Sequence, residues 1–225
     1  GCFMMPGVES EYHMLGVIEI DDVMDVMEEE TTEDINLMAG MSGEERVDST
    51  VLESAKSRIP WLIVNLFTAV MAAAVVANFE STIAKVVSLS SVMSIVTGMG
   101  GNAGTQSLTI LCRGLSLGEV DKDNAFQIFC KEITVGLLSG IVIGIIVAFG
   151  AWWFASNPWF GLVAGLAMIL NMLAANIAGY LVPVILKRLN IDPALASGVF
   201  VTTVTDCMGF FFFLGLATLF LPLLI

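Results

Sequence analysis

One acid lies within a long apolar stretch near the end of the chain. Residues 193–225 are long and apolar enough to cross a bilayer, yet they contain Asp206 and neither lysine nor arginine. A carboxylate at bilayer depth costs about 2.5 to 3.5 kcal/mol on insertion scales, so it needs water, a partner or a proton. On a helix, Gly198, Thr202 and Asp206 fall on one face, with Gly209 three residues further on. This face is small and polar, and we expect it to line a water-filled path.

A second polar group interrupts an earlier apolar run at residues 97–107. Four glycines and Asn102 occupy a stretch that hydropathy predicts to be one continuous helix. Glycine in a helix interior costs about 1 kcal/mol relative to alanine, and closely approached or irregular backbone in a membrane is buried in protein or lines a cavity. Close helix packing and pore lining are both open interpretations, and they are compatible. Pore lining is favoured by polar residues that lie roughly on one face with Asn102, namely Ser90, Ser94, Thr97 and Thr105.

The elements that position these residues follow from composition. The chain has 225 residues, 56% of them hydrophobic, and a net charge of −13, but residues 1–55 hold 15 of the 22 acids. From residue 60 onward, apolar runs of about 20 residues dominate, the length that spans hydrocarbon. We therefore expect an all-α integral membrane protein with an acidic cytoplasmic helical segment, surrounded by membrane lipid and without a nucleic-acid partner. No nucleophile–base pair or phosphate-binding loop is visible, so we expect no enzyme.

Hydropathy predicts five membrane spans, at about residues 61–78, 87–112, 128–155, 159–186 and 194–224. An odd number of spans places the two termini on opposite sides. With the amino terminus in the cytoplasm, eight of the nine basic residues lie on that side and only Lys85 on the other. The sequence thus predicts a multi-pass protein of the cell membrane with its carboxyl terminus outside. In the third span, Gly136, Gly140 and Gly144 repeat a small-x-x-x-small pattern that predicts close helix packing.

The acidic segment that precedes the spans has its own pattern. Residues 16–20 alternate like a short strand, and Asp21 or Asp22 can cap a helix that ends near residue 30. A second, mostly polar helical segment follows over about residues 32–57, interrupted by two glycines, and leads directly into the membrane. One strand and one helix cannot form a core. A run of charges is most often a solvated face, and sensing of a cation is the alternative.

Four sequence strings together resemble the MgtE family of bacterial magnesium channels and transporters. They are DDVMD at residues 21–25, RIPWL at 58–62, TGMGGNAGTQS at 97–107 and VTTVTD at 201–206. Each string alone is weak, but all four occur in the right order together with the five spans and the orientation. The resemblance covers the chain from about residue 16 to its carboxyl terminus.

The resemblance implies a homodimer of two identical subunits with five transmembrane helices in each. The pore would run along the two-fold axis between the second and fifth helices, and Asp206 matches the family's pore aspartate. Residues 1–31 resemble the end of a CBS domain, residues 32–58 the plug or connecting helix, and residues 59–225 the ion-conducting domain. The acids that match the family's regulatory metal-sensing positions are Asp22, Asp25, Glu30, Glu33 and Asp34.

The expected function is transport of Mg²⁺ through a dimeric pore, gated by cytoplasmic Mg²⁺. Mg²⁺ prefers octahedral oxygen ligation and dehydrates reluctantly, so a permeation site should hold its water shell with a few oxygens. Two Asp206 carboxylates would supply a charge of −2, the Thr202 carbonyl would accept a hydrogen bond from a bound water, and Asn102 would add a polar ligand. Such a ring selects hydrated divalent over monovalent cations by charge and width. Mg²⁺ bound to the acidic segment would screen its repulsion and let the plug helices pack.

Two other functions remain open at this point. An ion-coupled secondary transporter of Mg²⁺ or other divalent cations such as Co²⁺ and Ni²⁺ would use Asp206 as a protonatable carrier site. Its flux would depend on a proton or sodium gradient. A membrane adaptor without transport would use Asp206 and Asn102 as a buried polar pair that fixes helix packing. Substitution of Asp206 would then change assembly but not flux.

Overall fold

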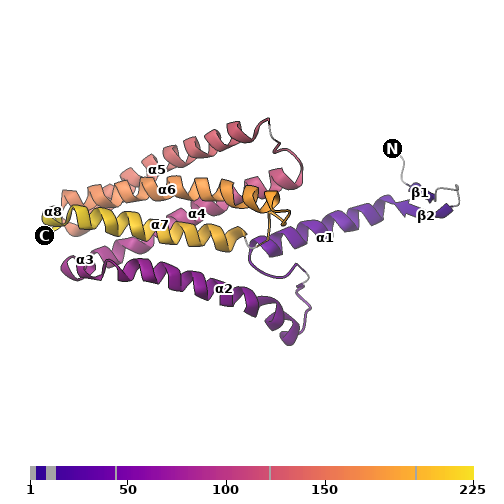
Figure 1. The fold of residues 1–225 in the computed structure, drawn as a ribbon, viewed down its shortest axis with the longest axis horizontal. Helices are drawn as coiled ribbons and strands as arrows, with labels where there is room; N and C mark the ends of the chain where they lie inside the picture. Colours follow the sequence, from indigo (N-terminus) through magenta and orange to yellow (C-terminus); the bar gives the residue numbers. More distant parts are fainter. Residues whose placement is uncertain (1–3, 9–13, 44, 122, 196) are drawn as a thin grey trace.

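The computed structural model describes residues 4–8, 14–43, 45–121, 123–195 and 197–225, and helices dominate this part of the chain (Figure 1). A two-stranded antiparallel hairpin at the amino-terminal end is the exception to the all-α architecture, and its second strand confirms the short strand expected from about residue 16. In chain order the elements are β1 (Met4–Val8), β2 (Met14–Glu19), α1 (Ile20–Met38), α2 (Val51–Ala77), α3 (Glu80–Lys85), α4 (Leu89–Ser116), α5 (Ala125–Ala155), α6 (Pro158–Arg188), α7 (Ser197–Leu219) and α8 (Leu221–Leu224).

Among the described residues, four helices are long and apolar enough to cross a membrane, namely α2, α5, α6 and α7. The remaining predicted span coincides with α4, which has 28 residues and is therefore about 42 Å long. This helix is less apolar than the others because residues 97–107 contribute glycines and polar side chains. The strand hairpin and α8 lie at opposite ends of the long axis of the molecule (Figure 1).

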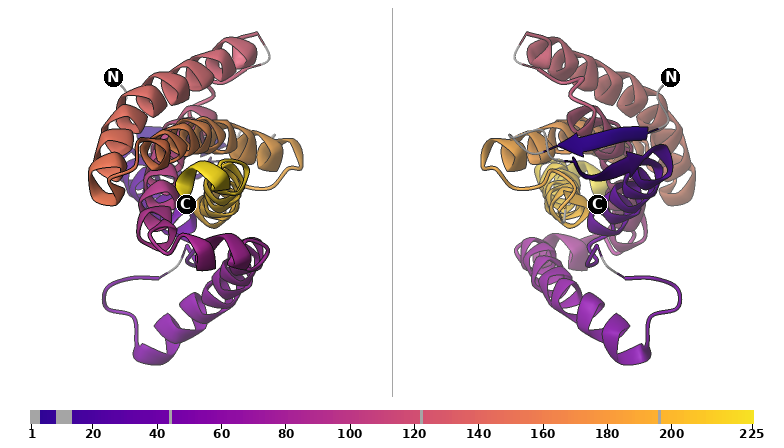
Figure 2. Two further views of the ribbon diagram at one scale, coloured as in Figure 1. Left: turned by 90° about the vertical axis from the view of Figure 1, so that its left-hand side faces the viewer. Right: turned by 90° about the vertical axis from the view of Figure 1, so that its right-hand side faces the viewer.

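Helix α6 lies at the centre of the bundle. It packs against α4, α5 and α7, whereas α2 packs mainly on α7 and leaves most of its surface uncovered (Figure 2). Of the most apolar 18 residues in each helix, 61% are buried in α6 but only 6% in α2. The fully buried large side chains come mostly from α4, α6 and α7, for example Leu108, Met168 and Phe213. These three helices form the core on which the candidate site rests.

Glycines allow α5 and α6 to approach closely, as the sequence predicts. A Cβ atom added at Gly140 would lie 3.2 Å from the backbone of Ile169, and one at Gly144 would lie 3.0 Å from the Gly165 carbonyl oxygen. Side chains at these positions would push the two backbones apart. Because lipid tails are as apolar as leucine, close packing of this kind is what holds membrane helices together.

The acidic helix α1 is longer than the sequence predicts. It begins after Glu19, whose backbone N–H donates to Asp22 at 2.9 Å, and it continues past residue 30, where we expect it to end. Thr31 and Thr32 donate their hydroxyl hydrogens to carbonyls one turn back in the same helix, at 2.7 and 2.9 Å. The two threonines are therefore accommodated within the helix and do not break it.

The interruption expected at the glycines of the polar segment over residues 32–57 is confirmed. Helix α1 ends at Met38, and Gly40 follows with φ of +73°, a left-handed conformation that commonly stops a helix. The chain resumes a helix only at Val51, where the Thr50 N–H donates to Glu53 at 2.8 Å. From there α2 runs without a break from the polar segment into the apolar span.

Candidate functional site

Asp206 lies on α7, partly buried, at a cleft of about 370 Å³ between α7 and α2. The other residues that line this cleft are small or apolar: Ala69, Ala72, Ala73, Val76 and Phe210. The ion pairs among the described residues all lie elsewhere in the chain, so within this part of the protein the Asp206 carboxylate has no cationic partner. A carboxylate in this position can attract a cation from outside the chain.

Thr202 lies one turn before Asp206 on the same face of α7. Its hydroxyl donates to the carbonyl of Gly198 at 2.9 Å and is therefore turned toward its own helix. Its carbonyl accepts a hydrogen bond from the hydroxyl of Thr205 at 3.0 Å. A backbone carbonyl has two lone pairs, so any ligand role of Thr202 falls to this carbonyl and competes with Thr205.

Asn102 is exposed on α4, which runs antiparallel to α7 (Figure 1). The two helices approach at Gly101 and Thr205, where a Cβ atom added to the glycine would lie 3.8 Å from the threonine hydroxyl. Asn102 and Asp206 each follow one of these contact residues. On antiparallel helices, a step of one residue turns both chains toward the same side of their interface. The structure therefore places both polar side chains on one side of the α4–α7 interface, without a hydrogen bond between them among the described contacts.

The predicted polar face of α7 does not extend to Gly209. Gly209 is buried, and a Cβ atom at this position would lie 2.8 Å from Thr97 Cγ2 and 2.8 Å from Asn171 Nδ2. A step of three residues turns a helix by about 300°, which brings Gly209 back toward α4. Thr97, expected to line a pore, is likewise buried, with 6% of its surface exposed. Gly209 and Thr97 are thus packing residues.

Glu132 was not identified from the sequence, where its position near a span end suggests a solvated carboxylate. It is 3% exposed, and its Oε2 atom accepts a hydrogen bond from the Ser107 hydroxyl at 2.7 Å. The interpretation as a solvated group is wrong because Glu132 precedes Gly136, Gly140 and Gly144 at the same spacing of four. It therefore lies on the face of α5 that packs inward. That spacing was the available signal.

The two asparagines of α6 behave as membrane amides are expected to. Asn171 donates to the carbonyl of Val96 at 2.8 Å, and Asn176 donates to the carbonyl of Met172 at 2.9 Å. Both side chains are buried. Nearby backbone carbonyls therefore satisfy one N–H of each amide.

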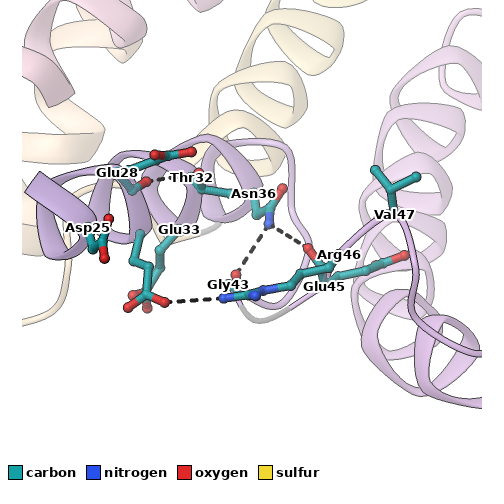
Figure 3. A pocket seen from close by; sticks show the side chains of 10 residues that line it. Asp25, Glu28, Thr32, Glu33, Asn36, Gly43, Glu45, Arg46 and Val47 are labelled. Atoms are coloured by element: carbon teal, nitrogen blue, oxygen red, sulfur yellow. Dashed lines mark hydrogen bonds and ion pairs between the residues drawn. The ribbon is translucent and has the colours of Figure 1, made fainter.

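The five acids proposed for regulation do not form one cluster. Asp22 takes part in the amino-terminal cap of α1, whereas Asp25 and Glu33 line a groove of about 790 Å³ between α1 and the loop that follows it (Figure 3). Other acids line the same groove, and Glu29 pairs there with Arg46 at 3.2 Å. Among the described residues, no group of three or more histidines, cysteines or acids is arranged to hold a metal ion.

Glu30 and Asp34 belong to a different environment from the groove. Asp34 is partly buried, and burial, with Asp192 and Glu30 nearby, raises the pKa of its carboxyl above the usual 3.8. The end of α1 also touches α7 directly, because a Cβ atom at Gly198 would lie 2.5 Å from the Met38 carbonyl oxygen. The acidic helix thus contacts the first turn of the helix that carries Asp206.

The loop between α1 and α2 is tied to both helices. Asn36 of α1 donates to the carbonyls of Gly43 and Glu45, at 3.3 and 3.2 Å (Figure 3). Arg58 of α2 donates from Nε to the Glu45 carboxylate at 2.8 Å, and this guanidinium lowers the pKa of Glu45 below its usual 4.5. A displacement of α1 can therefore be transmitted to the start of α2.

Comparison with known proteins gives a consistent picture. The MgtE family model, described as divalent cation transporter, matches residues 93–216, more than half of the chain. The magnesium transporter MgtE of Enterococcus faecalis is 35% identical over 219 residues, which are 96% of this chain and 48% of that protein. The magnesium transporters MgtE of Bacillus subtilis and Thermus thermophilus are each 32% identical, over 96% and 97% of this chain and 48% and 49% of theirs. The chain spans about half the length of these curated relatives.

Proposed function

The chain belongs to the MgtE family of divalent cation transporters, and we propose that it transports Mg²⁺ across the cell membrane through a pore that contains Asp206. The observation that carries this proposal is a carboxylate on α7 that has no cationic partner among the described residues. Its position on a helix of membrane-spanning length makes a stable unpaired charge costly unless a cation or water reaches it. The relatives named above are magnesium transporters, which supports Mg²⁺ as the cargo.

In this proposal five helices cross the membrane, with α4 as the fifth, and two identical subunits form the pore. Asn102 and Asp206 lie on the side of the α4–α7 interface where a second copy, related by a two-fold axis, would bring a second carboxylate. Helix α2 leaves an extensive apolar surface uncovered, which lipid or the second subunit would cover. The amino terminus lies in the cytoplasm and the carboxyl terminus outside, as the distribution of basic residues indicates.

The proposed selectivity is electrostatic. Two Asp206 carboxylates attract a divalent cation about twice as strongly as a monovalent one, because Coulomb energy scales with the charge of the ion. Mg²⁺ keeps most of its water shell, so Asp206, the Thr202 carbonyl and Asn102 bind the ion mainly through that shell. A divalent cation can therefore enter the pore without losing its water shell.

We further propose that α1 regulates the pore. Its last residue, Met38, contacts Gly198 at the start of α7, so a shift of α1 changes the helix that carries Asp206. Residues 1–31 would serve as the end of a CBS domain, residues 32–58 as the connecting segment and residues 59–225 as the conducting domain. Bound Mg²⁺ would lower the electrostatic repulsion among the acids of α1. Other chains or segments would complete the Mg²⁺ sites. The proposed sensing residues are Asp22, Asp25, Glu30, Glu33 and Asp34.

An ion-coupled secondary transporter is the second candidate function, and Glu132 favours it. This buried carboxylate accepts a hydrogen bond from the Ser107 hydroxyl and lies 3.8 Å from the exposed Lys131 ammonium, and a buried acid near the end of a membrane helix can exchange a proton during a carrier cycle. The two functions differ in a measurable way. A carrier stops when the proton or sodium gradient is removed, whereas a pore gives single-channel currents that follow the Mg²⁺ gradient.

The proposal is tested by Mg²⁺ flux into proteoliposomes that contain purified Asp206→Asn, Asp206→Glu or unsubstituted protein. Removal of both charges from the pore should lower flux at least about tenfold, equivalent to ~1.4 kcal/mol, whereas Asp206→Glu should retain part of it. Glu80→Gln is the matched control, because it also removes a carboxylate but from an exposed position on α3. Equal flux in Asp206→Asn and unsubstituted protein would exclude this carboxylate from the ion path.

A further inference from the structure

Asn171 is fully buried in the middle of α6, with none of its surface exposed. Its amide nitrogen donates to the Val96 carbonyl of α4 at 2.8 Å. Its amide oxygen, Oδ1, is buried and accepts no hydrogen bond from any residue that the structure describes. This asparagine is therefore half satisfied in the most tightly packed part of the bundle.

Two glycines make room for this amide. A Cβ atom added at Gly100 of α4 would lie 2.1 Å from Asn171 Nδ2, and one at Gly209 of α7 would lie 2.8 Å from the same nitrogen. Real Cβ atoms essentially never approach other atoms so closely. The amide of Asn171 therefore occupies the space that side chains on α4 and α7 would otherwise take, and it forms a wedge among three helices.

The energetics argue against stability as the main reason for an amide at this position. An unsatisfied buried acceptor is costly, and leucine has a similar shape without polar atoms. Leucine would fill the same space in an apolar bundle. What leucine cannot supply is a directional hydrogen bond to the Val96 carbonyl, which holds α4 at one height and rotation relative to α6.

The wedge lies at the depth of the proposed ion ligands. Gly100 precedes Asn102 by two residues, or about 3 Å along α4, and Gly209 follows Asp206 by three residues, or about 4.5 Å along α7. We propose that Asn171 is a positioning residue that fixes the separation of α4 and α7 at this depth and thereby sets how strongly the pore holds its divalent ion. This inference rests on the proposed function of Asp206. In this proposal Asn171, which is fully buried, acts through the two helices and is not an ion ligand.

The first test is Asn171→Leu, with Mg²⁺ flux measured over a range of concentrations. A purely structural residue would change the amount of folded protein, and hence the maximal flux, but not the Mg²⁺ concentration that gives half of it. We expect this half-saturating concentration to change by about threefold or more, which is the fold-change that corresponds to one average interhelical hydrogen bond in a membrane. The folded fraction on size-exclusion chromatography should equal that of the unsubstituted protein. An unchanged half-saturating concentration overturns the proposal.

A second test does not require that the helix bundle tolerate leucine at position 171. Gly100→Ala places a Cβ atom against the Asn171 amide, and Asn171→Ala removes that amide. We expect Gly100→Ala to shift the half-saturating concentration by about threefold or more on its own and by much less in the Asn171→Ala background, because residues in contact are non-additive. The control is Gly150→Ala on α5, outside the proposed pore, where an added Cβ meets no atom within 4 Å. Equal effects of Gly100→Ala in both backgrounds, or equal effects of Gly100→Ala and Gly150→Ala, overturn the wedge.

Asp206→Asn, measured in parallel, separates failure of this inference from failure of the proposed function. Loss of flux in Asp206→Asn together with unaltered saturation in the Asn171 and Gly100 variants overturns the positioning role alone. Normal flux in Asp206→Asn overturns the proposed function and the inference that rests on it.

Discussion

Ser107→Ala removes the hydrogen-bond donor from a buried carboxylate. Ser107 Oγ lies 2.7 Å from Glu132 Oε2, and Ser107 and Glu132 are each 3% exposed, so water is not at hand to replace the lost bond. Hydrogen bonds to charged groups contribute about 1.5 to 3 kcal/mol. For a chain of this size 1 kcal/mol corresponds to roughly 2 to 4 °C, so we expect the melting temperature in detergent to fall by about 3 to 12 °C.

The assay is thermal unfolding of purified protein, in which the fraction of protein that remains monodisperse after heating is measured. Ser139→Ala on α5 is the control, because that hydroxyl donates only to carbonyls of its own helix and should shift the midpoint by less than about 2 °C. In a Glu132→Gln background the bond is neutral, and the effect of Ser107→Ala should fall to about half. A melting temperature that Ser107→Ala leaves unchanged would refute the claim that this bond stabilises the α4–α5 contact.

Two further predictions concern packing of the bundle and the acidic helix α1. Gly179→Ala should destabilise the bundle by about 1 to 3 kcal/mol in thermal unfolding, since its Cβ would lie 2.7 Å from the Gly104 carbonyl oxygen, whereas Gly150→Ala, with nothing within 4 Å, should not. Because the pKa of Asp34 is raised, the Asp34 carboxyl contributes most favourably to docking of α1 below pH 3.8. This contribution is lost as the pH rises through the pKa of the carboxyl in the folded protein. Asp34→Asn, which also removes repulsion from Asp192, should therefore slow amide hydrogen exchange at the end of α1 at pH 7; faster exchange would contradict this.

The sequence predicts the long helices because their signal is local. Apolar runs of membrane-spanning length and the glycines at 140 and 144 each report a property of one helix. The structure has helices at these runs, four of them long and apolar enough to cross a membrane, and it confirms close packing at the two glycines. The position of Asp206 within such a run is equally local. Its proposed role as an ion ligand remains a prediction, because that role depends on a second subunit and an ion.

Burial of polar groups depends on the neighbouring helix, and the sequence is less informative about it. The sequence suggests a solvated Glu132, but in the structure Ser107 of α4 lies opposite it and donates a hydrogen bond. The sequence likewise suggests that Gly209 belongs to a polar face, but the Asn171 side chain of α6 packs against it. The same holds for α1, where sequence pattern predicts a stop near residue 30 but threonine side chains bond to the helix itself and the stop comes at Gly40. Tertiary contacts decide each of these cases.

Binding and flux of Mg²⁺ in one preparation test the central claim most directly. Reconstituted Asp206→Ala protein is compared with unsubstituted protein by titration with Mg²⁺ and by Mg²⁺ entry into vesicles under the same gradient. If Asp206 lies in the ion path, both the binding attributable to the membrane helices and the flux should be lost with the carboxylate while the melting temperature is maintained. If flux persists in Asp206→Ala, the carboxylate is structural and the ion crosses the protein elsewhere.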